Sequence, residues 1–541
     1  MLEKNKCYDA EVTDITSEGN GVCRVENMAV FVPCTAVGDK ISVKIVKVLK
    51  NYSFGIVDKI IEPSQNRIDS GCKFSQKCGG CIFQHISYEA ECRVKSEMVQ
   101  NAIKRIGGVE PNFEGIVPCN TFERYRNKAQ YPLADINGKV TCGFYAQRSH
   151  RLIPITDCIL QPKIFSEILN TIIDYLNEKK ISAYNESSGT GLMRHIYIRE
   201  GTHSKEIMVC FVARRDVSRQ LSALCHILTD KFPTIKSLIL NINPDNTNVI
   251  LGKKCVTLWG EDTITDTMCE NTIEISPLSF YQVNTLQAEK LYAKALEYAQ
   301  PTPNDVISDL YCGAGTIGLS MANNVKKLIG IEIIPQAVEN ARKNASCNNI
   351  HNAEFFCGDA GTVFSDLKNS DCSPNIIIVD PPRKGCSVET LISVASAAPE
   401  KIVMISCNPS TAARDIKWLC NNSFILSKCC AFDLFPRTGH VETVVLLSRE
   451  KVDGYVSVDL DVEKIVSKSG TGFATYKELK TYIKEQNGLS VSSLNIAQIK
   501  DKCGLEKRKN YYKGDEGHKV PNCPAKKEKA ILEAFKHFGI I

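Results

Sequence analysis

The sequence predicts an α/β protein whose main domain is an open, largely parallel β-sheet, and three observations support this prediction. Between residues 276 and 450, β-rich runs alternate with helical stretches, which is typical of a doubly wound sheet. Residues 1–60 contain only short β-rich runs separated by glycine turns, which predicts a small barrel. Residues 61–275 mix strand and helix patterns and carry closely spaced cysteines near their start. A helical extension over residues 451–541 completes the expected order of domains.

The composition is that of an ordinary globular protein. The 541 residues leave room for about three or four domains of normal size. Apolar residues make up 43% of the chain and charged residues 23%, as in soluble proteins. No apolar segment follows the charged start, and no run reaches the roughly 18 apolar residues that a membrane span needs. We therefore expect a cytoplasmic monomer with no membrane partner.

The cysteine count and the net charge of +5 bear on which metals and partners the chain could bind. In a long chain without a signal peptide, 25 cysteines favour reduced thiols and a metal or cluster site over disulfides. Residues 451–541 contain 17 Lys and Arg and 12 Asp and Glu, so the excess positive charge lies there. This balance permits a polyanionic partner but does not require one, because an ordinary solvated surface explains it as well.

The first domain is expected to be an OB-like barrel of five short strands. Barrels of this kind often bind nucleic acid, although the pattern fits a barrel that binds none equally well. The expected strands are residues 8–15, 21–25, 29–32, 40–48 and 53–60.

Three cysteines with the spacing C-x5-C-G-G-C can converge on one centre. These are Cys72, Cys78 and Cys81, and two glycines tighten the loop between the last two. A zinc ion and a 4Fe-4S cluster both accept four cysteines, so spacing alone does not separate them, nor does it exclude a site without metal. The candidates for a fourth ligand are Cys92, Cys119, Cys142 and Cys158.

The sheet domain carries a glycine-rich loop between its first strand and first helix. Gly313, Gly315 and Gly318 match G-x-G-x-x-G, and Glu332 ends the next strand, where a carboxylate can accept both ribose hydroxyls. This arrangement serves NAD and S-adenosyl-L-methionine equally well. The expected parallel strands are residues 306–310, 328–332, 353–357, 376–380 and 402–406, with a late strand at 441–447.

Three acidic residues favour the methyl donor over the dinucleotide. Asp309 opens the glycine loop, and Asp359 follows the third strand, where an Asp commonly meets adenine. Asp380 closes the fourth strand within Asp-Pro-Pro, a feature that a dehydrogenase does not need. Each lies at the carboxyl end of a strand, where ligands bind to open α/β sheets. A helix N-cap is the alternative explanation of Asp359.

Cys407 is the candidate nucleophile. It follows a predicted buried strand in Ser-Cys-Asn-Pro, whereas a packed, inert cysteine is the alternative. Addition of a thiolate to C6 of uracil makes C5 nucleophilic, and a base must later remove the C5 proton. Asp380 supplies a carboxylate for the ring, and Glu442 is the candidate base, unless it is only a surface carboxylate. His440 is a second possible proton acceptor, with a structural role as its alternative.

These motifs, in this order, resemble the iron–sulfur, TRAM-containing family of RNA uridine C5-methyltransferases. The resemblance implies a class I S-adenosylmethionine-dependent methyltransferase fold, with Cys407 as nucleophile and Glu442 as base. It implies that Phe280 stacks on the target base, unless that ring is a core aromatic. It places four residues around the donor and the target base, namely Gln282, Tyr311, Glu332 and Asp380. The matching runs are residues 280–284, 309–315, 380–385, 406–409 and 435–442.

The resemblance also covers the first half of the chain. Residues 1–60 resemble a TRAM domain, an RNA-binding module. Residues 124–128, Arg-Tyr-Arg-Asn-Lys, are expected to form an RNA-contacting strand of residues 61–275. The resemblance further implies that a 4Fe-4S cluster serves as a structural staple and is held by Cys72, Cys78, Cys81 and Cys158.

The combined cluster and TRAM module resembles the branch that methylates 23S ribosomal RNA, so 23S rRNA is the expected partner. A tRNA methyltransferase is the first alternative, because that branch usually lacks both features. A nicotinamide-dependent oxidoreductase with a ferredoxin-like cluster is the alternative of another class. An RNA-binding protein with a degenerate catalytic domain is the third alternative, and the intact Cys407, Asp380 and Glu442 argue against it.

The extension over residues 451–541 lies outside the family pattern. Helices are expected at residues 475–485, 492–503 and 525–538, with a basic, aromatic segment at 507–513. A helix–turn–helix that contacts RNA and a helical cap with a solvated basic loop both fit this pattern.

Overall fold

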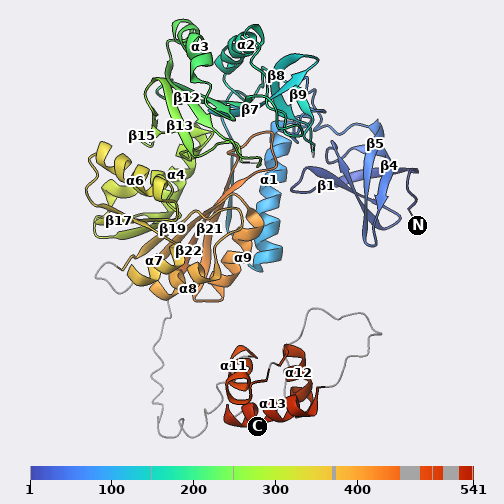
Figure 1. The fold of residues 1–541 in the computed structure, drawn as a ribbon. Helices are drawn as coiled ribbons and strands as arrows, with labels where there is room; N and C mark the ends of the chain where they lie inside the picture. The colour runs from blue at the N-terminus through green and yellow to red at the C-terminus, as the bar shows by residue number, and fades with distance from the viewer. Residues whose placement is uncertain are drawn as a thin grey trace. The chain divides into compact units, whose positions relative to one another are not determined.

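The computed structural model describes residues 2–147, 149–247, 249–367, 373–450, 476–489, 491–503, 523–538 and 540. The chain forms two compact units, Met1–Glu450 and Lys451–Ile541. The first unit contains the barrel, a central sheet and a larger sheet flanked by helices (Figure 1).

The N-terminal strands close into a barrel with the order β1-β2-β3-β5-β4. Its apolar core includes Val12, Val30 and Val43, all fully buried. The alternation of buried and exposed residues along each strand places this core inside the barrel. The five-stranded barrel expected from the sequence is therefore confirmed. The strands are β1 (Cys7–Ile15), β2 (Asn20–Val25), β3 (Met28–Pro33), β4 (Lys40–Val48) and β5 (Tyr52–Glu62).

The central domain is a seven-stranded sheet with the order β13-β12-β11-β10-β7-β8-β9. Two amphipathic helices, α2 (Lys163–Glu178) and α3 (Ser218–Lys231), pack on it through a shared core. A two-stranded ribbon, β14 (Ile264–Met268) with β15 (Asn271–Ile275), follows. The sheet strands are β7 (Lys128–Ile136), β8 (Lys139–Tyr145), β9 (Leu152–Pro154), β10 (Met193–Glu200), β11 (Ile207–Ala213), β12 (Ile235–Ile242) and β13 (Lys254–Gly260).

The larger sheet has eight strands in the order β18-β17-β16-β19-β20-β22-β21-β6. The five strands expected to be parallel are so, and β22 pairs antiparallel with β20. The strands predicted from the sequence did not include β6 and β21, which extend the sheet beyond β22. The strands are β6 (Phe113–Val117), β16 (Val306–Leu310), β17 (Lys327–Glu332), β18 (Ala353–Cys357), β19 (Ile376–Val379), β20 (Lys401–Ser406), β21 (Phe424–Phe432) and β22 (Glu442–Arg449).

Helices cover both faces of this sheet, which explains the continuous apolar run Ile-Ile-Ile-Val in β19. Ile376 and Ile378 pack in one core and Ile377 and Val379 in the other, because successive side chains point to opposite faces. The helices that contribute to the first core are α4 (Thr285–Ala299), α5 (Thr316–Met321) and α6 (Pro335–Cys347). Those that contribute to the second are α1 (Tyr88–Ala102), α7 (Ala360–Leu367), α8 (Val388–Ala397) and α9 (Pro409–Cys420).

The second unit contains the three helices expected from the sequence. They are α11 (Tyr476–Asn487), α12 (Ser493–Lys502) and α13 (Ala525–His537). Leu479, Ile496, Ile531 and Phe535 are buried between them in a core of their own. The basic segment expected at 507–513 lies outside the described residues. Among the helices that the structure describes, none combines the length and the apolar character needed to cross a membrane.

Candidate active site

Five of the predicted site residues lie at the carboxyl ends of five adjacent strands, at one edge of the large sheet. Because β18, β17, β16, β19 and β20 run parallel, their carboxyl ends meet along this edge. The order of the strands changes direction at β16, because β17 and β18 lie on one side of it and β19 and β20 on the other. Ligands of open α/β sheets bind at such a switch point. In the order of the strands across the sheet, the residues are Asp359, Glu332, Tyr311, Asp380 and Cys407.

The glycine loop after β16 is shaped by hydrogen bonds to two carboxylates. Gly313 N–H donates to Glu332 Oε2 (3.1 Å), and Gly318 N–H donates to the buried Asp309 Oδ2 (2.9 Å). Burial raises the pKa of Asp309 to about 8. Gly313 has φ 56° with open space where a side chain would stand. The loop therefore leaves room for a ligand and presents its backbone to it.

Glu332 and Asp359 are both engaged by backbone groups. Glu332 Oε1 accepts from Ile334 N–H (2.9 Å) in the turn after β17, while Oε2 bonds to the glycine loop, and each oxygen keeps a lone pair for a ribose hydroxyl. Asp359 Oδ1 accepts from Gly361 and Thr362 N–H at the start of α7. The N-cap explanation of Asp359 is thus confirmed for one oxygen. Exposed Ile333, at 62%, offers an apolar surface beside these carboxylates.

Cys407 and Glu442 come together through strand register. Ser406, the last residue of β20, pairs with Thr443 in β22, so the next residue on each side, Cys407 and Glu442, lies at the same edge. Burial, together with the charges of Glu442 and Asp380, raises the pKa of the Cys407 thiol to about 11. Arg383 opposes this shift. The thiol is therefore protonated at neutral pH in the free protein.

The two carboxyl groups beside the thiol also hold their protons unusually well. Burial, and then the charge of Asp380, raises the pKa of Glu442 to about 8, although Arg383 lowers it. Burial raises the pKa of Asp380 to about 7. The three acidic groups share one desolvated site, an arrangement typical of groups that exchange protons.

The loop between β19 and α8 is held by α9. Arg414 donates to the Lys384 and Cys386 carbonyls, and Asp415 accepts from Cys386 N–H (2.8 Å). Arg383 donates to His440 Nε2 (3.3 Å), which leaves that nitrogen already engaged. This contact favours the structural interpretation of His440.

The segment that carries Phe280 and Gln282 is anchored by the central domain. Asn127 Nδ2 donates to the Gln282 carbonyl (2.9 Å), and the fully buried Arg199 donates to the Ser276 and Ser279 carbonyls (3.1 Å each). The Gln282 side chain lies against Tyr292, a neighbour of Asp380. The Phe280 ring is 69% exposed, so it is not a core aromatic.

Residues 124–128 differ from the strand that the sequence predicts, because β7 begins only at Lys128. Arg124 bonds to Asp157 and to the Cys158 and Gln161 carbonyls. Tyr125 and Asn127 are buried and direct their polar atoms into the protein. RNA contact by this segment remains a prediction.

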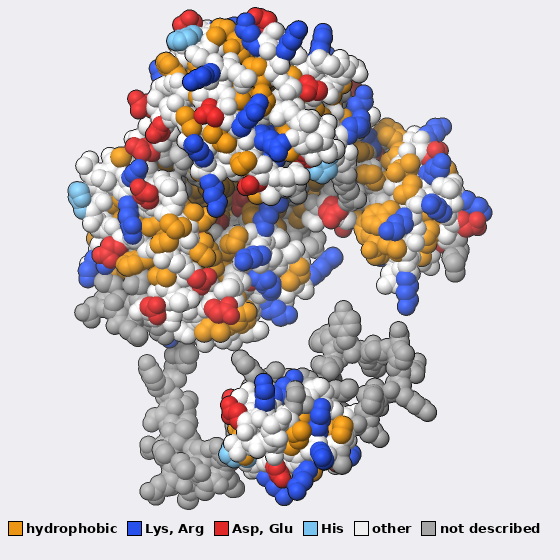
Figure 2. Space-filling view, in the orientation of Figure 1, with side chains coloured by type: hydrophobic (Ala, Val, Ile, Leu, Met, Phe, Trp, Pro, Cys, Tyr) orange, Lys and Arg blue, Asp and Glu red, His pale blue; other side chains and the backbone are white. Residues whose placement is uncertain are grey.

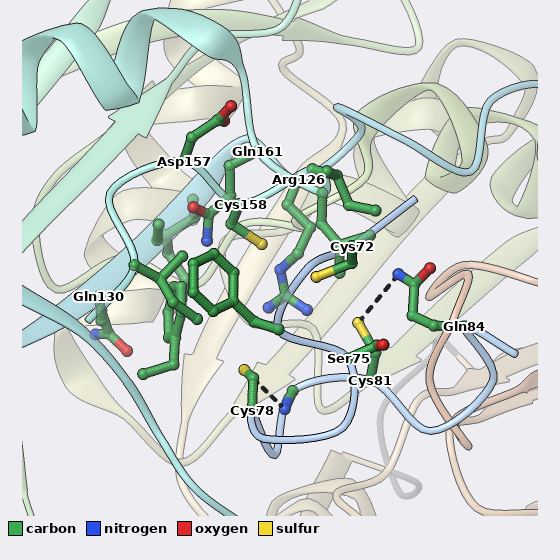
Figure 3. Close-up of a pocket in the computed structure, with 18 residues that line it drawn as sticks. Cys72, Ser75, Cys78, Cys81, Gln84, Arg126, Gln130, Asp157, Cys158 and Gln161 are labelled. Carbon is green, nitrogen blue, oxygen red and sulfur yellow. Dashed lines mark hydrogen bonds between the residues drawn. The ribbon is translucent and has the colours of Figure 1, made fainter. Parts of the chain in front are cut away.

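The four predicted cysteine ligands line one cavity of about 250 Å³ (Figure 3). Cys72, Cys78 and Cys81 come from the loop before α1, and Cys158 comes from the loop after β9. Arg126 extends among them. Of the other candidates for the fourth ligand, Cys92, Cys119 and Cys142 do not line this cavity.

The thiols of this cavity are the residues that would hold a metal centre. A zinc ion would need four sulfurs within about 2.3 Å of one point. Among the described residues, no group of three or more His, Cys, Asp or Glu side chains is arranged to hold a metal ion. Burial raises the pKa of Cys81 to about 12 and that of Cys158 to about 11, and the neighbouring thiols add to both shifts. A cationic centre would offset this repulsion, and four cysteines are a donor set that both zinc and an iron–sulfur cluster accept.

Comparison with known proteins identifies the chain. Residues 88–450 match the family described as tRNA (Uracil-5-)-methyltransferase, and residues 2–57 match the TRAM domain. The chain belongs to this family of RNA uracil-5 methyltransferases. Membership decides against the nicotinamide-dependent oxidoreductase, and the intact edge formed by Cys407, Asp380 and Glu442 argues against a degenerate catalytic domain.

The matches between this methyltransferase and its relatives cover nearly the whole length of each relative. An uncharacterized RNA methyltransferase of Staphylococcus epidermidis is 41% identical over 453 residues, which are 83% of this chain and 99% of the relative. One of Oceanobacillus iheyensis is 40% identical over 449 residues, 83% of this chain and 97% of the relative.

One solved structure shares the fold over most of the chain. The tRNA (uracil-54, C5)-methyltransferase of Pyrococcus abyssi, in complex with S-adenosyl-L-homocysteine, has a TM-score of 0.65 and 26% identity. The similarity covers 81% of this chain and 100% of that one. The fold of the first unit is therefore that of an α/β S-adenosylmethionine-dependent methyltransferase with an N-terminal TRAM barrel.

Several residues that shape the site were not predicted from the sequence. Arg199 and Arg437 are nearly fully buried, and Lys95 is fully buried between Glu91 and Asp433. Lys95 and Asp433 are 338 residues apart in the chain, so no local pattern links them. These charged residues stand out only in the folded structure, because charged side chains are rarely buried.

Proposed function

We propose that this methyltransferase methylates C5 of uridine in 23S ribosomal RNA through a covalent bond between Cys407 Sγ and C6 of the base. The observation that carries the proposal is the meeting of Cys407, Glu442 and Asp380 at the carboxyl edge of the sheet, beside the glycine loop. S-adenosylmethionine would supply an electrophilic methyl group there.

The first step assigned to the protein is attack on the ring. The Cys407 thiol gives its proton to water, its sulfur forms a bond to C6, and the C5–C6 electron pair moves toward a ring carbonyl. With its pKa raised to about 7, Asp380 can hold a proton at neutral pH and donate it in a hydrogen bond to that oxygen. C5 becomes nucleophilic and would accept the methyl group, with S-adenosylhomocysteine as the leaving group.

Release needs a base. The Glu442 carboxylate takes the proton from C5, the electron pair restores the C5–C6 double bond, and Cys407 leaves as a thiolate. Burial and the neighbouring Asp380 make Glu442 a stronger base than a solvated carboxylate. The exposed Phe280 ring would stack on the uracil after it leaves the RNA stack.

The donor would be held by residues on either side of β16. Glu332 would accept the ribose hydroxyls, and Asp359, whose Oδ2 is not used in the helix cap, would meet the adenine beside Ile333. Gln282, next to Tyr292, would approach the methionine portion. Tyr311, fixed by its hydroxyl contact with Thr390 (3.0 Å), would border the ring.

We assign a 4Fe-4S cluster to Cys72, Cys78, Cys81 and Cys158. The assignment is supported by their common cavity and by Arg126, whose positive charge would complement a centre held by four thiolates. The cluster would join two loops that lie far apart in the chain.

The choice of RNA rests on the combination of cluster and TRAM barrel. The barrel alone does not decide between 23S rRNA and tRNA, because the structural similarity to the tRNA enzyme of Pyrococcus abyssi covers 81% of this chain. That similarity keeps tRNA as the second candidate.

The deciding experiment uses methyl-tritiated S-adenosylmethionine with separated, unmodified 23S rRNA and tRNA, under anaerobic conditions, followed by nucleoside analysis. We expect label in 5-methyluridine from 23S rRNA and none with Cys407→Ala. Label only in tRNA would keep the chemistry and replace the substrate. Turnover by Cys407→Ala would remove the covalent mechanism.

A further inference from the structure

The loop that leads into Glu442 is fastened to the cysteine site from two sides. This loop, residues 433–441, connects β21 to the start of β22 and is called the base loop below. The first contact comes directly after Cys81. Ile82 and Phe83 N–H both donate to the Arg437 carbonyl, at 2.9 and 3.2 Å. The polypeptide that leaves a cluster ligand therefore bonds immediately to the base loop.

The second contact comes from the other half of the cysteine site. The buried Tyr125 hydroxyl donates to the Pro436 carbonyl (3.0 Å). Its neighbour Arg124 donates to the Cys158 carbonyl (3.0 Å), and Arg126 N–H donates to the Leu160 carbonyl (2.9 Å). The chain after Cys81 thus bonds directly to Arg437, whereas the Cys158 loop reaches the neighbouring Pro436 through residues 124–126.

The base loop also has rigid support from α1. Lys95 Nζ lies 2.7 Å from both Glu91 and Asp433 and donates to the Phe435 carbonyl (3.2 Å). Glu91 accepts from Arg437 N–H (2.6 Å). Lys95, Glu91 and Asp433 are all fully buried. A shift of this loop would therefore separate the ion pair between Lys95 and Asp433 where water cannot solvate the charges. Displacement is therefore costly, and the loop has few alternative positions.

Close packing carries the contact on toward the catalytic edge. A side-chain carbon on Gly439 would lie 2.8 Å from Ile82 Cδ1 and 2.6 Å from the Ser17 carbonyl, so Ile82 presses against the backbone three residues before Glu442. Cys407 is held differently, by β20 and by Asn408, which donates to the Arg383 carbonyl (3.1 Å). The cysteine site thus reaches the base more directly than the nucleophile.

We infer that the four-cysteine site positions the base loop, with Tyr125 and Arg437 as positioning residues, so that an intact centre is needed for release of the RNA more than for attack on it. The inference rests on the proposed function. A bound cluster would hold the Cys81 and Cys158 loops at a fixed separation. The bonds of Ile82 and Phe83 to Arg437, and of Tyr125 to Pro436, would then place Glu442 at the C5 proton. Loss of the cluster would arrest the protein as its RNA adduct.

The first test changes one hydroxyl. Tyr125→Phe removes the bond to Pro436 and keeps the ring. The matched control is Tyr175→Phe, because Tyr175 is also buried and its hydroxyl donates to the Gln220 carbonyl (2.8 Å) in the central domain. In single-turnover reactions of unmodified RNA with S-adenosylmethionine, we expect Tyr125→Phe to form adduct at the normal rate and to release the methylated RNA about 3- to 10-fold more slowly. Tyr175→Phe should match the wild type. Equal slowing of attack and release by Tyr125→Phe, or no slowing, would overturn the inference.

The second test removes the metal and reads the backbone. Iron is chelated anaerobically, and amide hydrogen exchange is compared with that of the holoprotein and of a reconstituted sample. We expect faster exchange at Ile82, Phe83 and Arg437, with unchanged exchange in β20, and a larger fraction of protein trapped on RNA. Unchanged exchange and trapping would overturn the inference while leaving the proposed function intact. A purified protein without iron, or methylation by Cys407→Ala, would instead overturn the proposed function.

Discussion

At the scale of single residues, the protonation of Glu442 sets how release depends on pH. Its pKa is raised to about 8, so the fraction available as a base grows as the pH rises through this value. We expect the release rate of the adduct to increase from pH 6 to pH 9 and then level off. Stopped samples, separated into adduct and free methylated RNA at each pH, measure this rate directly. A release rate that is flat across this range would assign the base elsewhere.

Replacement of Glu442 separates the two halves of the reaction. Glu442→Gln keeps the shape of the side chain but cannot accept the C5 proton, so adduct should accumulate and release should slow by roughly 100-fold or more. Glu400→Gln is the matched control, because Glu400 precedes β20 at the opposite end of the sheet. Denaturing gels with labelled RNA report the adduct. Normal release by Glu442→Gln would exclude Glu442 as the base.

The same substitution has a predictable effect on stability. The pKa of Glu442 rises from 4.5 to about 8 on folding, so the protonated form is favoured in the folded protein. Its ionisation therefore destabilises the fold progressively between about pH 4.5 and 8, and the full penalty is present above 8. Glu442→Gln removes this penalty. Urea unfolding should show a stability gain that is larger at pH 9 than at pH 6, whereas an equal gain at both would contradict the raised pKa.

At the scale of structural elements, the outer face of the barrel is suited to RNA. Phe31, Tyr52 and Phe54 pack edge to face or tilted, with ring centroids 5.5 to 5.8 Å apart, on neighbouring strands β3 and β5. Lys47 pairs with Phe54 across β4 and β5. Figure 2 shows apolar side chains gathered on the barrel with basic ones among them. Rings that bases can stack on, beside lysines, form the usual surface for single-stranded RNA.

Removal of one of these rings should weaken binding without changing the chemistry. Tyr52→Ala is expected to raise the KM for RNA about tenfold and to leave kcat unchanged, because one base-stacking contact is lost. Trp259→Ala, at 39% exposure on the edge strand β13 compared with 38% for Tyr52, is the control. Steady-state kinetics at fixed salt measure both parameters. A change in kcat alone would show that the barrel acts on catalysis rather than on binding.

The loops of the cysteine site give a prediction about ligand identity. Cys158→Ser should lose most of its iron and the associated visible absorption, because one of four thiolates is gone. Cys142→Ser, a buried cysteine on the adjacent strand β8 that does not line the cavity, should retain both. Metal analysis of the anaerobically purified variants settles the choice. Loss of iron in Cys142→Ser, with retention in Cys158→Ser, would reassign the fourth ligand.

The elements that followed local rules were the ones predictable from the sequence. Asp380 and Cys407 were placed correctly at one edge because parallel strands align their carboxyl ends. β21 was missed because Ser427 and Lys428 interrupt its apolar run, and the strand register shifts at that point. β6 was missed because its pairing with β21 joins residues more than 300 positions apart. Such pairings depend on tertiary packing, which no local pattern records.

At the scale of the whole molecule, both family matches, residues 2–57 and 88–450, lie within the first unit. The relative from Staphylococcus epidermidis matches 83% of this chain over 99% of its own length. The second unit, Lys451–Ile541, has a separate core and makes its own compact body. The catalytic edge, the barrel and the cysteine cavity all lie in Met1–Glu450. We therefore expect the methyltransferase reaction not to depend on folding of the extension.

Truncation after Glu450 tests this division and the charge of the extension together. Residues 451–541 carry an excess of five positive charges, equal to the whole net charge of +5, so the truncated protein is nearly neutral. We expect an unchanged kcat and unchanged iron content, with a KM for long RNA that rises severalfold at low salt and hardly at all at high salt. This salt dependence follows because attraction between lysines and phosphates falls steeply with ionic strength. A KM shift that is equal at both salt concentrations would point to a specific contact by the extension, and a large loss of kcat would place the extension in the catalytic machinery.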